Sequence, residues 1–269
     1  MSLVLVDCVS AIIRKAEDVT SGKIVPVEKS DLPVLARIEL TDNPHEHHLM
    51  YRADHDEDIN YVVANQCCHI MRLFGVEEES RFLPVSSRQS MMTYLLQVEG
   101  ELKKLETIYG RANIKQFVLM WYQGLIFQLT KMPTDIMIDK WLYYNCPELI
   151  PVQKSSLEKQ RSDAVRSLDP QWQGMAPSIV YYASNVMNYV YFKILEDLFQ
   201  ADFTGPYHST LFIMDGRELV NRTLDRELTD DHNGDRKRID SWAELLNLSG
   251  WYEWVPFREH PGPANMFSG

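Results

Sequence analysis

Hydrophobic residues recur every three or four positions through most of the chain after residue 58, which is the period of helices with one buried face. This spacing predicts helices over five segments: 58–74, 86–110, 113–129, 157–168 and 179–199. The last segment is apolar on several sides, a pattern typical of a helix at the centre of a core. Ser86 or Ser87 is placed to start the second segment, and Gly75 is placed to end the first.

Two later stretches are expected to interrupt the helices. Residues 133–135, Pro-Thr-Asp, predict a break, because proline removes a backbone donor from a helix. Thr134 is then placed to cap a new helix that contains Asp139 and ends near Cys146. Residues 230–235 are rich in Asp, with Asn and Gly, and predict a polar turn.

Short runs near the N-terminus have the character of strands, because apolar and polar residues alternate in them. They are Lys23–Glu28, Ala36–Thr41 and His48–Arg52, and they predict a small antiparallel sheet. The acidic run at 54–58 suits the start of the following helix, where negative charge meets the positive helix end. Residues 3–13 are expected to form a packed amphipathic helix.

These elements predict an α+β protein that is mostly α-helical. The chain has 269 residues, of which 45% are hydrophobic, so it is long enough to bury a large core. Residues 1–150 are expected to hold the small sheet and the helices that cover it. Residues 151–269 are expected to form a helical extension packed on them, which gives one compact unit.

The charge of the chain excludes some classes of partner. A formal charge of -11 disfavours nonspecific binding of nucleic acid, because an acidic surface repels phosphate. Arg236-Lys237-Arg238 is a compact basic run, which is interpreted as a solvated turn before a helix. No stretch of the sequence approaches the roughly 18 consecutive apolar residues of a membrane span, so no membrane partner is expected.

The four cysteines give an expectation for the compartment. Cys67 and Cys68 are adjacent, and together with Cys8 and Cys146 they do not resemble the spaced framework of a disulfide-stapled secreted domain. This pattern favours a reducing cytoplasm.

The segment Asn65-Gln66-Cys67-Cys68-His69 has the frame of a zinc-protease helix, His-Glu-x-x-His, with its first two letters changed. In the intact motif the two histidines lie one turn apart on the same helix face and bind one Zn²⁺, and the glutamate polarises the metal-bound water. Here amides stand at the first ligand position, Asn65, and at the base position, Gln66, while His69 remains.

The order of a strand pair, an acidic cap and the helical segment 61–72 resembles the ImmA/IrrE-like zinc metallopeptidases. Residues 132–142 resemble the later helix that supplies a carboxylate as third ligand in such enzymes. The resemblance covers roughly residues 25–150 and implies a zincin-like core. It places Asn65 at the first ligand, Gln66 at the base, His69 at the second ligand and Asp139 at the third. The groove that it implies is formed by Asn65, Gln66, His69, Asp139, His48 and Tyr51.

These substitutions predict a catalytically inactive, metallopeptidase-like protein. An amide oxygen is a poor ligand for Zn²⁺, and a glutamine cannot take a proton from water at neutral pH. No catalytic residue and no cofactor are therefore expected. The preferred function is the binding of a protein or peptide partner in a regulatory role, with a peptide added as a strand at the sheet edge.

Two other interpretations stay open. The first is an active metal-dependent hydrolase, in which His69, Asp139 and a ligand from the His45–His48 cluster or from Cys67 or Cys68 hold zinc. The second is a helical interaction or structural protein unrelated to peptidases. Convergence of the side chains of Asn65, His69 and Asp139 in one cleft distinguishes the first two interpretations from the third.

Overall fold

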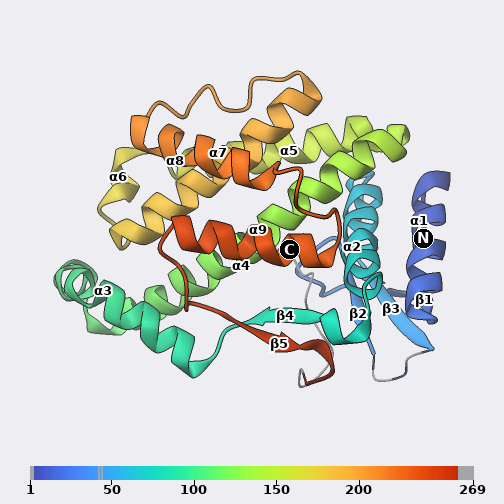
Figure 1. Cartoon of the computed structure of the whole chain (residues 1–269), viewed down its shortest axis with the longest axis horizontal. Helices are drawn as coiled ribbons and strands as arrows, with labels where there is room; N and C mark the ends of the chain where they lie inside the picture. Colours follow the sequence, from blue (N-terminus) through green and yellow to red (C-terminus); the bar gives the residue numbers. More distant parts are fainter. Residues whose placement is uncertain (1–2, 42, 44, 260–269) are drawn as a thin grey trace.

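The computed structural model describes residues 3–41, 43 and 45–259 (Figure 1). Helices make up 66% and strands 10%, which confirms a mostly helical protein with small sheets. The helices are α1 (Asp7–Thr20), α2 (Asp58–Phe74), α3 (Arg88–Tyr109), α4 (Arg111–Asn145), α5 (Ile150–Arg166), α6 (Pro170–Gln173), α7 (Ser178–Phe199), α8 (Thr210–Thr223) and α9 (His232–Leu245). The strands are β1 (Lys23–Glu28), β2 (Ala36–Leu40), β3 (Glu46–Tyr51), β4 (Phe82–Val85) and β5 (Glu253–Pro256).

The first sheet is mixed, so the prediction of an antiparallel sheet is wrong for one of its two pairs. The strand order is β1-β3-β2, and β3 runs antiparallel to β2 but parallel to β1. β3 lies in the centre because four of its six residues are buried, whereas most of β1 is exposed. Pro26 in β1 lacks a backbone donor, which suits a strand at an edge.

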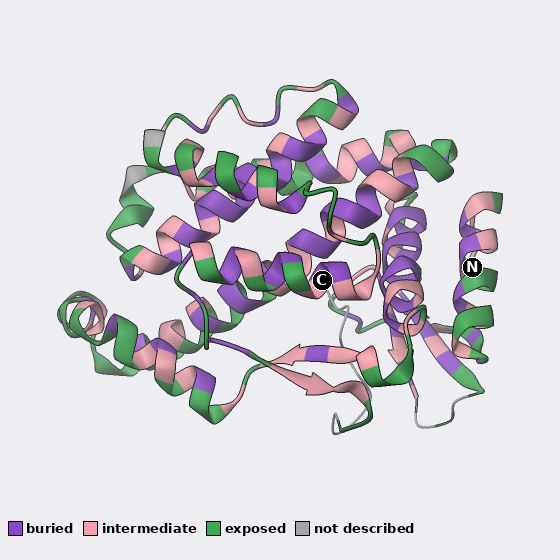
Figure 2. Cartoon of the chain, in the orientation of Figure 1, coloured by how far each residue is buried: buried purple, intermediate pink, exposed green. Residues whose placement is uncertain are grey.

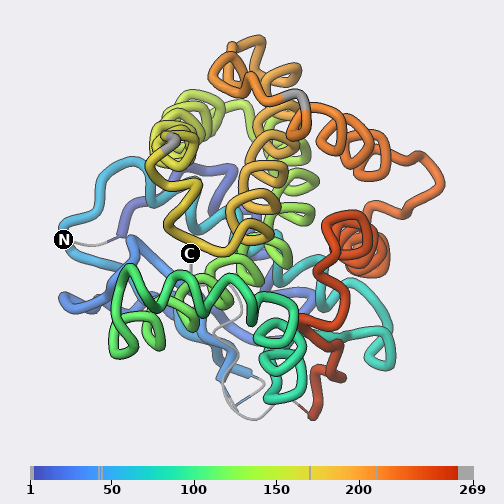
Figure 3. Tube along the Cα trace, turned by 90° about the vertical axis from the view of Figure 1, so that its left-hand side faces the viewer, coloured from blue at the N-terminus to red at the C-terminus, as the bar shows by residue number. Residues whose placement is uncertain are grey.

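α4 is one helix of 35 residues, so the predicted break at Pro133 is wrong. Leu129 and Ile136 on either side of the proline are fully buried, and α4 packs along α7 (Figures 1 and 3). Burial on both sides of the proline outweighs the hydrogen bond that it removes. Thr134 is buried within the helix and does not cap one.

Two other helix boundaries agree with the sequence prediction, and one, the start of α9, does not. Ser87 caps α3, since its Oγ accepts from the backbone N–H of Ser90 at 3.1 Å, and Gly75 follows the last residue of α2. α9 was not expected to begin as early as His232, in the predicted polar turn. Asp231 starts it by accepting from the backbone N–H of Gly234 at 2.9 Å.

Two hydrophobic clusters share α4. One cluster lies among α1, the first sheet, α2 and the last turns of α4, which contribute Ile138 and Leu142. The larger cluster surrounds α7 and includes Leu129 and Ile136 of α4. α2 is buried along most of its length between α1, the sheet and α4 (Figure 2). Polar residues on the buried faces of α2 therefore lie in the interior of the protein.

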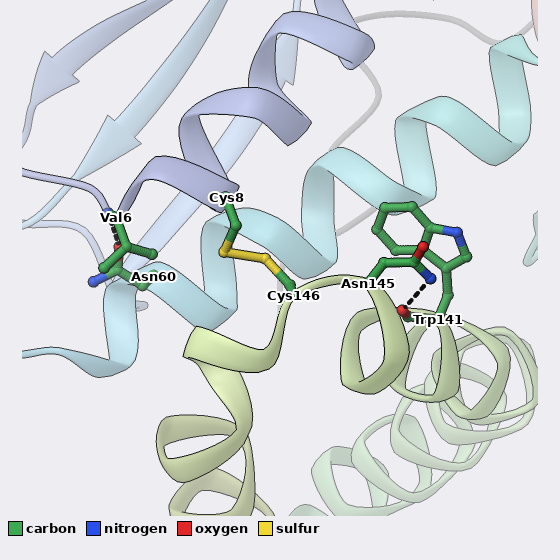
Figure 4. The surroundings of a disulfide bond; sticks show 6 residues. All are labelled: Val6, Cys8, Asn60, Trp141, Asn145 and Cys146. Carbon is green, nitrogen blue, oxygen red and sulfur yellow. Dashed lines mark hydrogen bonds between the residues drawn. A yellow bond between two sulfur atoms is a disulfide. The ribbon is translucent and has the colours of Figure 1, made fainter.

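Cys8 and Cys146 form a disulfide that ties the first turn of α1 to the end of α4 (Figure 4). The pattern of cysteines did not predict this crosslink. The two cysteines are 138 residues apart in the sequence. Near the disulfide, Asn60 Oδ1 accepts a hydrogen bond from the Val6 N–H at 3.0 Å, which also holds the start of α1 against α2. Cys67 and Cys68 are buried free thiols. Within the described residues, no helix is long and apolar enough to cross a membrane.

Candidate functional site

A stripe of polar side chains joins α2 to α4 inside the protein. Tyr61, Asn65 and His69 follow one another at intervals of four residues, so they share one face of α2. Asp135 and Asp139 have the same spacing on α4. The two helices pack together, and the carboxylates of α4 meet the polar face of α2.

Asp135 is the carboxylate that contacts both motif residues. Its Oδ1 lies 3.1 Å from Asn65 Nδ2 and 2.8 Å from His69 Nε2. The Asp135 side chain is 13% exposed and the His69 side chain 8%. Burial alone would raise the pKa of Asp135, but Lys131, His69 and Asn65 outweigh it and hold the pKa below its usual value. Asp135 is therefore an anion held by the two α2 side chains.

Asp139, the predicted third ligand, lies one turn further along α4 and has other partners. It is fully buried, and its carboxylate accepts from Tyr61 Oη at 2.7 Å, Gln153 Nε2 at 2.8 Å and Tyr191 Oη at 2.8 Å. Burial and the neighbouring Asp135 raise the pKa of Asp139 to about 7, although its three hydrogen bonds oppose the shift. These donors link α2, α5 and α7 through one carboxylate.

Gln66, at the base position, binds the backbone of β2. Its Nε2 donates to the Ala36 carbonyl at 2.7 Å, and its Oε1 accepts from the Ile38 N–H at 2.5 Å. Both groups belong to the outer side of an edge strand, so the amide occupies the positions that an added strand would use. Glu17 does the same at β1, where it accepts from the Ile24 N–H at 2.9 Å.

The histidine-rich strand β3 is separate from this stripe. His48 pairs with Glu46 at 3.1 Å, and Tyr51 packs edge-on against the His55 ring at 5.8 Å. Burial, with His48 nearby, lowers the pKa of His47. Across residues 3–41, 43 and 45–259, no group of three or more His, Cys, Asp or Glu side chains is arranged to hold a metal ion.

A groove of about 640 Å³, here called the α2–α4 groove, opens beside the stripe. Its wall on one side comes from α2 and from the connection between β1 and β2, and its other wall comes from α4 with parts of α5 and α7. Its lining residues include Leu35, Val62, Asn65, Phe127, Lys131 and Asp135. His48, Tyr51, His69 and Asp139 are not among its lining residues, whereas Asn65 and Gln66 are. The predicted set Asn65, His69 and Asp139 therefore does not meet in this groove, and Asp135 contacts the first two in place of Asp139.

Asp135 was not predicted as a site residue, although it lies in the segment 132–142 that resembles the third-ligand helix. Asp135 and Asp139 lie on the same face of α4, and the spacing does not tell which of them is level with His69. Gln153 and Tyr191 were also missed, because they come from α5 and α7, outside the segment covered by the resemblance.

Comparison with known proteins gives no relative: no family model, no curated protein and no solved structure matches the chain. The resemblance to ImmA/IrrE-like metallopeptidases therefore stays a prediction from the motif.

Proposed function

We propose that this protein is a catalytically inactive, zincin-like scaffold that acts by binding a protein or peptide partner in a regulatory role. One observation carries the proposal: the residues at the motif positions form hydrogen bonds within the protein. Asn65 and His69 both bind Asp135, and Gln66 binds the backbone of β2. In a hydrolase, the side chains at these positions would bind the metal and activate the water molecule.

The donor set does not fit zinc. Zn²⁺ prefers imidazole, thiolate and carboxylate ligands, and Asn65 presents an amide whose Nδ2 donates to Asp135. Cys67 and Cys68 are buried, and burial raises the pKa of each thiol, to about 12 for Cys68, which opposes formation of the thiolate that binds metal. The residues at these positions therefore do not fit a catalytic zinc site.

The α2–α4 groove is the surface proposed for the partner. Strand addition at the first sheet is disfavoured, because Gln66 and Glu17 occupy backbone groups on both outer strands. The groove instead offers the apolar side chains of Val62 and Phe127 beside the polar Asn65–Asp135 pair. This combination suits a peptide side chain that has an apolar body and a polar end.

Metal analysis tests the loss of the zinc site. The wild-type protein is expected to contain far less than stoichiometric zinc and to cleave no peptide when zinc is added. Asn65→His restores an imidazole four residues before His69, and this variant is expected to gain stoichiometric zinc. The gain should disappear in Asn65→His/His69→Ala and in Asn65→His/Asp135→Ala.

Each outcome separates one interpretation. Stoichiometric zinc in the wild-type protein, abolished by His69→Ala, would support a working hydrolase and overturn the proposal. Failure of a folded Asn65→His variant to bind zinc would overturn the zincin-like scaffold and favour an unrelated interaction protein.

Peptide selection tests the groove. Peptides enriched from a displayed random library on the immobilised protein are expected to lose binding to Val62→Arg, which places a long charged side chain in the groove. Val25→Arg is the matched control, because Val25 is an exposed β1 residue outside the groove. Equal binding to both variants, or no enrichment, would contradict the proposed surface.

The disulfide sets a condition on the cytoplasmic location proposed from the sequence. In a reducing compartment Cys8 and Cys146 would be thiols, since disulfides persist mainly in oxidising ones. Thiol alkylation in intact cells therefore tests the location: a free Cys8–Cys146 pair supports the cytoplasm, and a crosslinked pair contradicts it.

A further inference from the structure

A second cavity, here called the α9 pocket, has a volume of about 560 Å³ and is lined by residues of α2, α4, α9 and the antiparallel strand pair β4–β5. Figure 1 shows how these elements are arranged. This volume falls in the roughly 300–1,000 Å³ range of small-molecule sites. Leu83, Phe127 and Ile239 contribute to its apolar wall. It neighbours the α2–α4 groove, because Phe127 and Lys131 line both.

Arg236 brings a half-buried charge to this pocket, and no ion pair to it is formed within the described residues. Its guanidinium carbon lies 4.1 Å from the centroid of the Phe82 ring and 5.0 Å from that of Trp254. Among the described residues it has no ion pair or hydrogen bond, and its Nε is enclosed without a partner. The Asp240 carboxylate lies near and favours the charged form of Arg236, but it forms no ion pair with it, and its Oδ1 accepts from Tyr252 Oη at 2.6 Å and Trp254 Nε1 at 2.8 Å. The sequence-based interpretation of this run as a solvated turn is wrong, because all three residues lie in α9, Arg238 is buried and Arg236 is half-buried.

The other titratable groups of the pocket do not neutralise Arg236. Asp235 is bound by Arg72 through two contacts of 2.6 and 2.7 Å, and Arg72 also binds Asp230 at 2.8 Å. Burial, together with the nearby arginines, lowers the pKa of His232 to about 4, so its ring is neutral at pH 7. Lys131 adds a second cation, whose Nζ lies 5.3 Å from the centroid of the Phe127 ring.

His69 also lines the α9 pocket, and it faces the Asp135 carboxylate at 2.8 Å. Arg236 therefore lies in a cavity whose one lining carboxylate, Asp235, is already bound by Arg72. Lys131 adds a second positive charge, which also acts on Asp135. A partly buried cation without a partner is costly, and a bound anion removes that cost. The flat aromatic rings beside Arg236 provide an apolar surface next to this charge.

We infer that the α9 pocket binds a small anion with a flat, apolar body, whose carboxylate or phosphate group lies at Arg236. The terminal nitrogens of Arg236 supply charge-assisted hydrogen bonds to that group. The body of the ligand packs against the apolar wall. This inference does not depend on the proposed partner-binding function, since Arg236, Phe82 and Trp254, which carry it, lie outside the α2–α4 groove.

Calorimetric titration with three matched compounds tests the inference. The probes are 2-naphthoate, 2-naphthyl phosphate and the neutral 2-naphthylmethanol, which share one aromatic body. At least one anion is expected to bind the wild-type protein about tenfold or more tightly than the neutral compound, because a hydrogen bond to a charged group is worth about that factor. The better anion identifies the carboxylate or the phosphate class.

Arg236→Gln is expected to weaken binding of that anion about tenfold to a hundredfold and to leave the neutral compound unchanged. Lys237→Gln is the matched control, because it removes the same charge from the next, exposed position of α9 and should have little effect. The comparison of anion with neutral compound uses wild-type protein alone, so it stands even if Arg236→Gln does not fold. Equal binding of all three probes, no binding of either anion, or equal effects of the two variants would overturn the inference.

Discussion

Gln66→Glu introduces the carboxylate that the resembled protease motif has at this position, and we predict that it destabilises the protein. The Gln66 side chain is 3% exposed and uses both ends of its amide on β2. A carboxylate still accepts from the Ile38 N–H, but it cannot donate to the Ala36 carbonyl. The second oxygen then faces another acceptor in a buried position.

The cost follows from the lost donor and the new charge. An unsatisfied buried acceptor costs about 1–3 kcal/mol, and a buried carboxylate adds to this until it takes up a proton. We therefore expect a loss of about 2–4 kcal/mol in the free energy of unfolding at pH 7. The pKa of the introduced carboxyl should be raised in the folded state. Its protonated form can donate to Ala36, so the defect should shrink as the pH falls from 7 to 5.

Urea unfolding followed by the fluorescence of the six tryptophans measures this effect at each pH. Gln116→Glu is the control, because it makes the same chemical change at an exposed position in α4 and should change stability by less than about 0.5 kcal/mol. The reasoning would be refuted by a Gln66→Glu variant as stable as the control, or by a defect that grows as the pH falls.

Three other predictions concern the disulfide and the buried Asp139. Cys8→Ser/Cys146→Ser should lower the free energy of unfolding by about 2–5 kcal/mol, because the crosslink constrains a long loop in the unfolded chain; urea unfolding with and without reductant measures it. Alkylation of the denatured protein should label two cysteines before reduction and four after it, as mass spectrometry will count. Because burial raises the pKa of Asp139 to about 7, its proton is held more tightly in the folded state, so stability should fall as the pH rises from about 4 to 7. Asp139→Asn should flatten that slope in unfolding curves recorded between these values, and an unchanged slope would contradict the assignment.

The fold was predictable where the signal was local. α2 and α7 show helical periodicity over their full lengths, and Ser87 has the side chain of a helix cap. The prediction at Pro133 was wrong because the burial of Leu129 and Ile136 outweighs the tendency of proline to break a helix. That burial depends on tertiary packing, which the sequence around the proline does not indicate. The parallel pair β1–β3 was also not predicted, because the strand order depends on tertiary packing, which places the more buried strand β3 in the centre.

The site was predictable only in part. The spacing of Asn65 and His69 placed them on one face of α2, and the structure brings both to one oxygen of Asp135. The partner of Gln66 was not predictable, because a backbone group on a strand 28 residues earlier has no signature in the sequence. The disulfide between Cys8 and Cys146 was also not predictable, since only the packing of α1 beside the end of α4 brings these residues together.

The amides of α2 and the architecture around them are physically linked. Asp135 would be compensated by a cation in a metal site, and here two N–H donors from Asn65 and His69 take that place. A neutral Gln66 can both donate to and accept from an edge strand, whereas a glutamate can only accept while it is ionised. Asn65 and Gln66, which stand where the resembled motif has a zinc ligand and a general base, thus satisfy buried backbone and carboxylate groups. Replacing one of them changes both the chemistry of the motif and the hydrogen bonds that hold α2 in place.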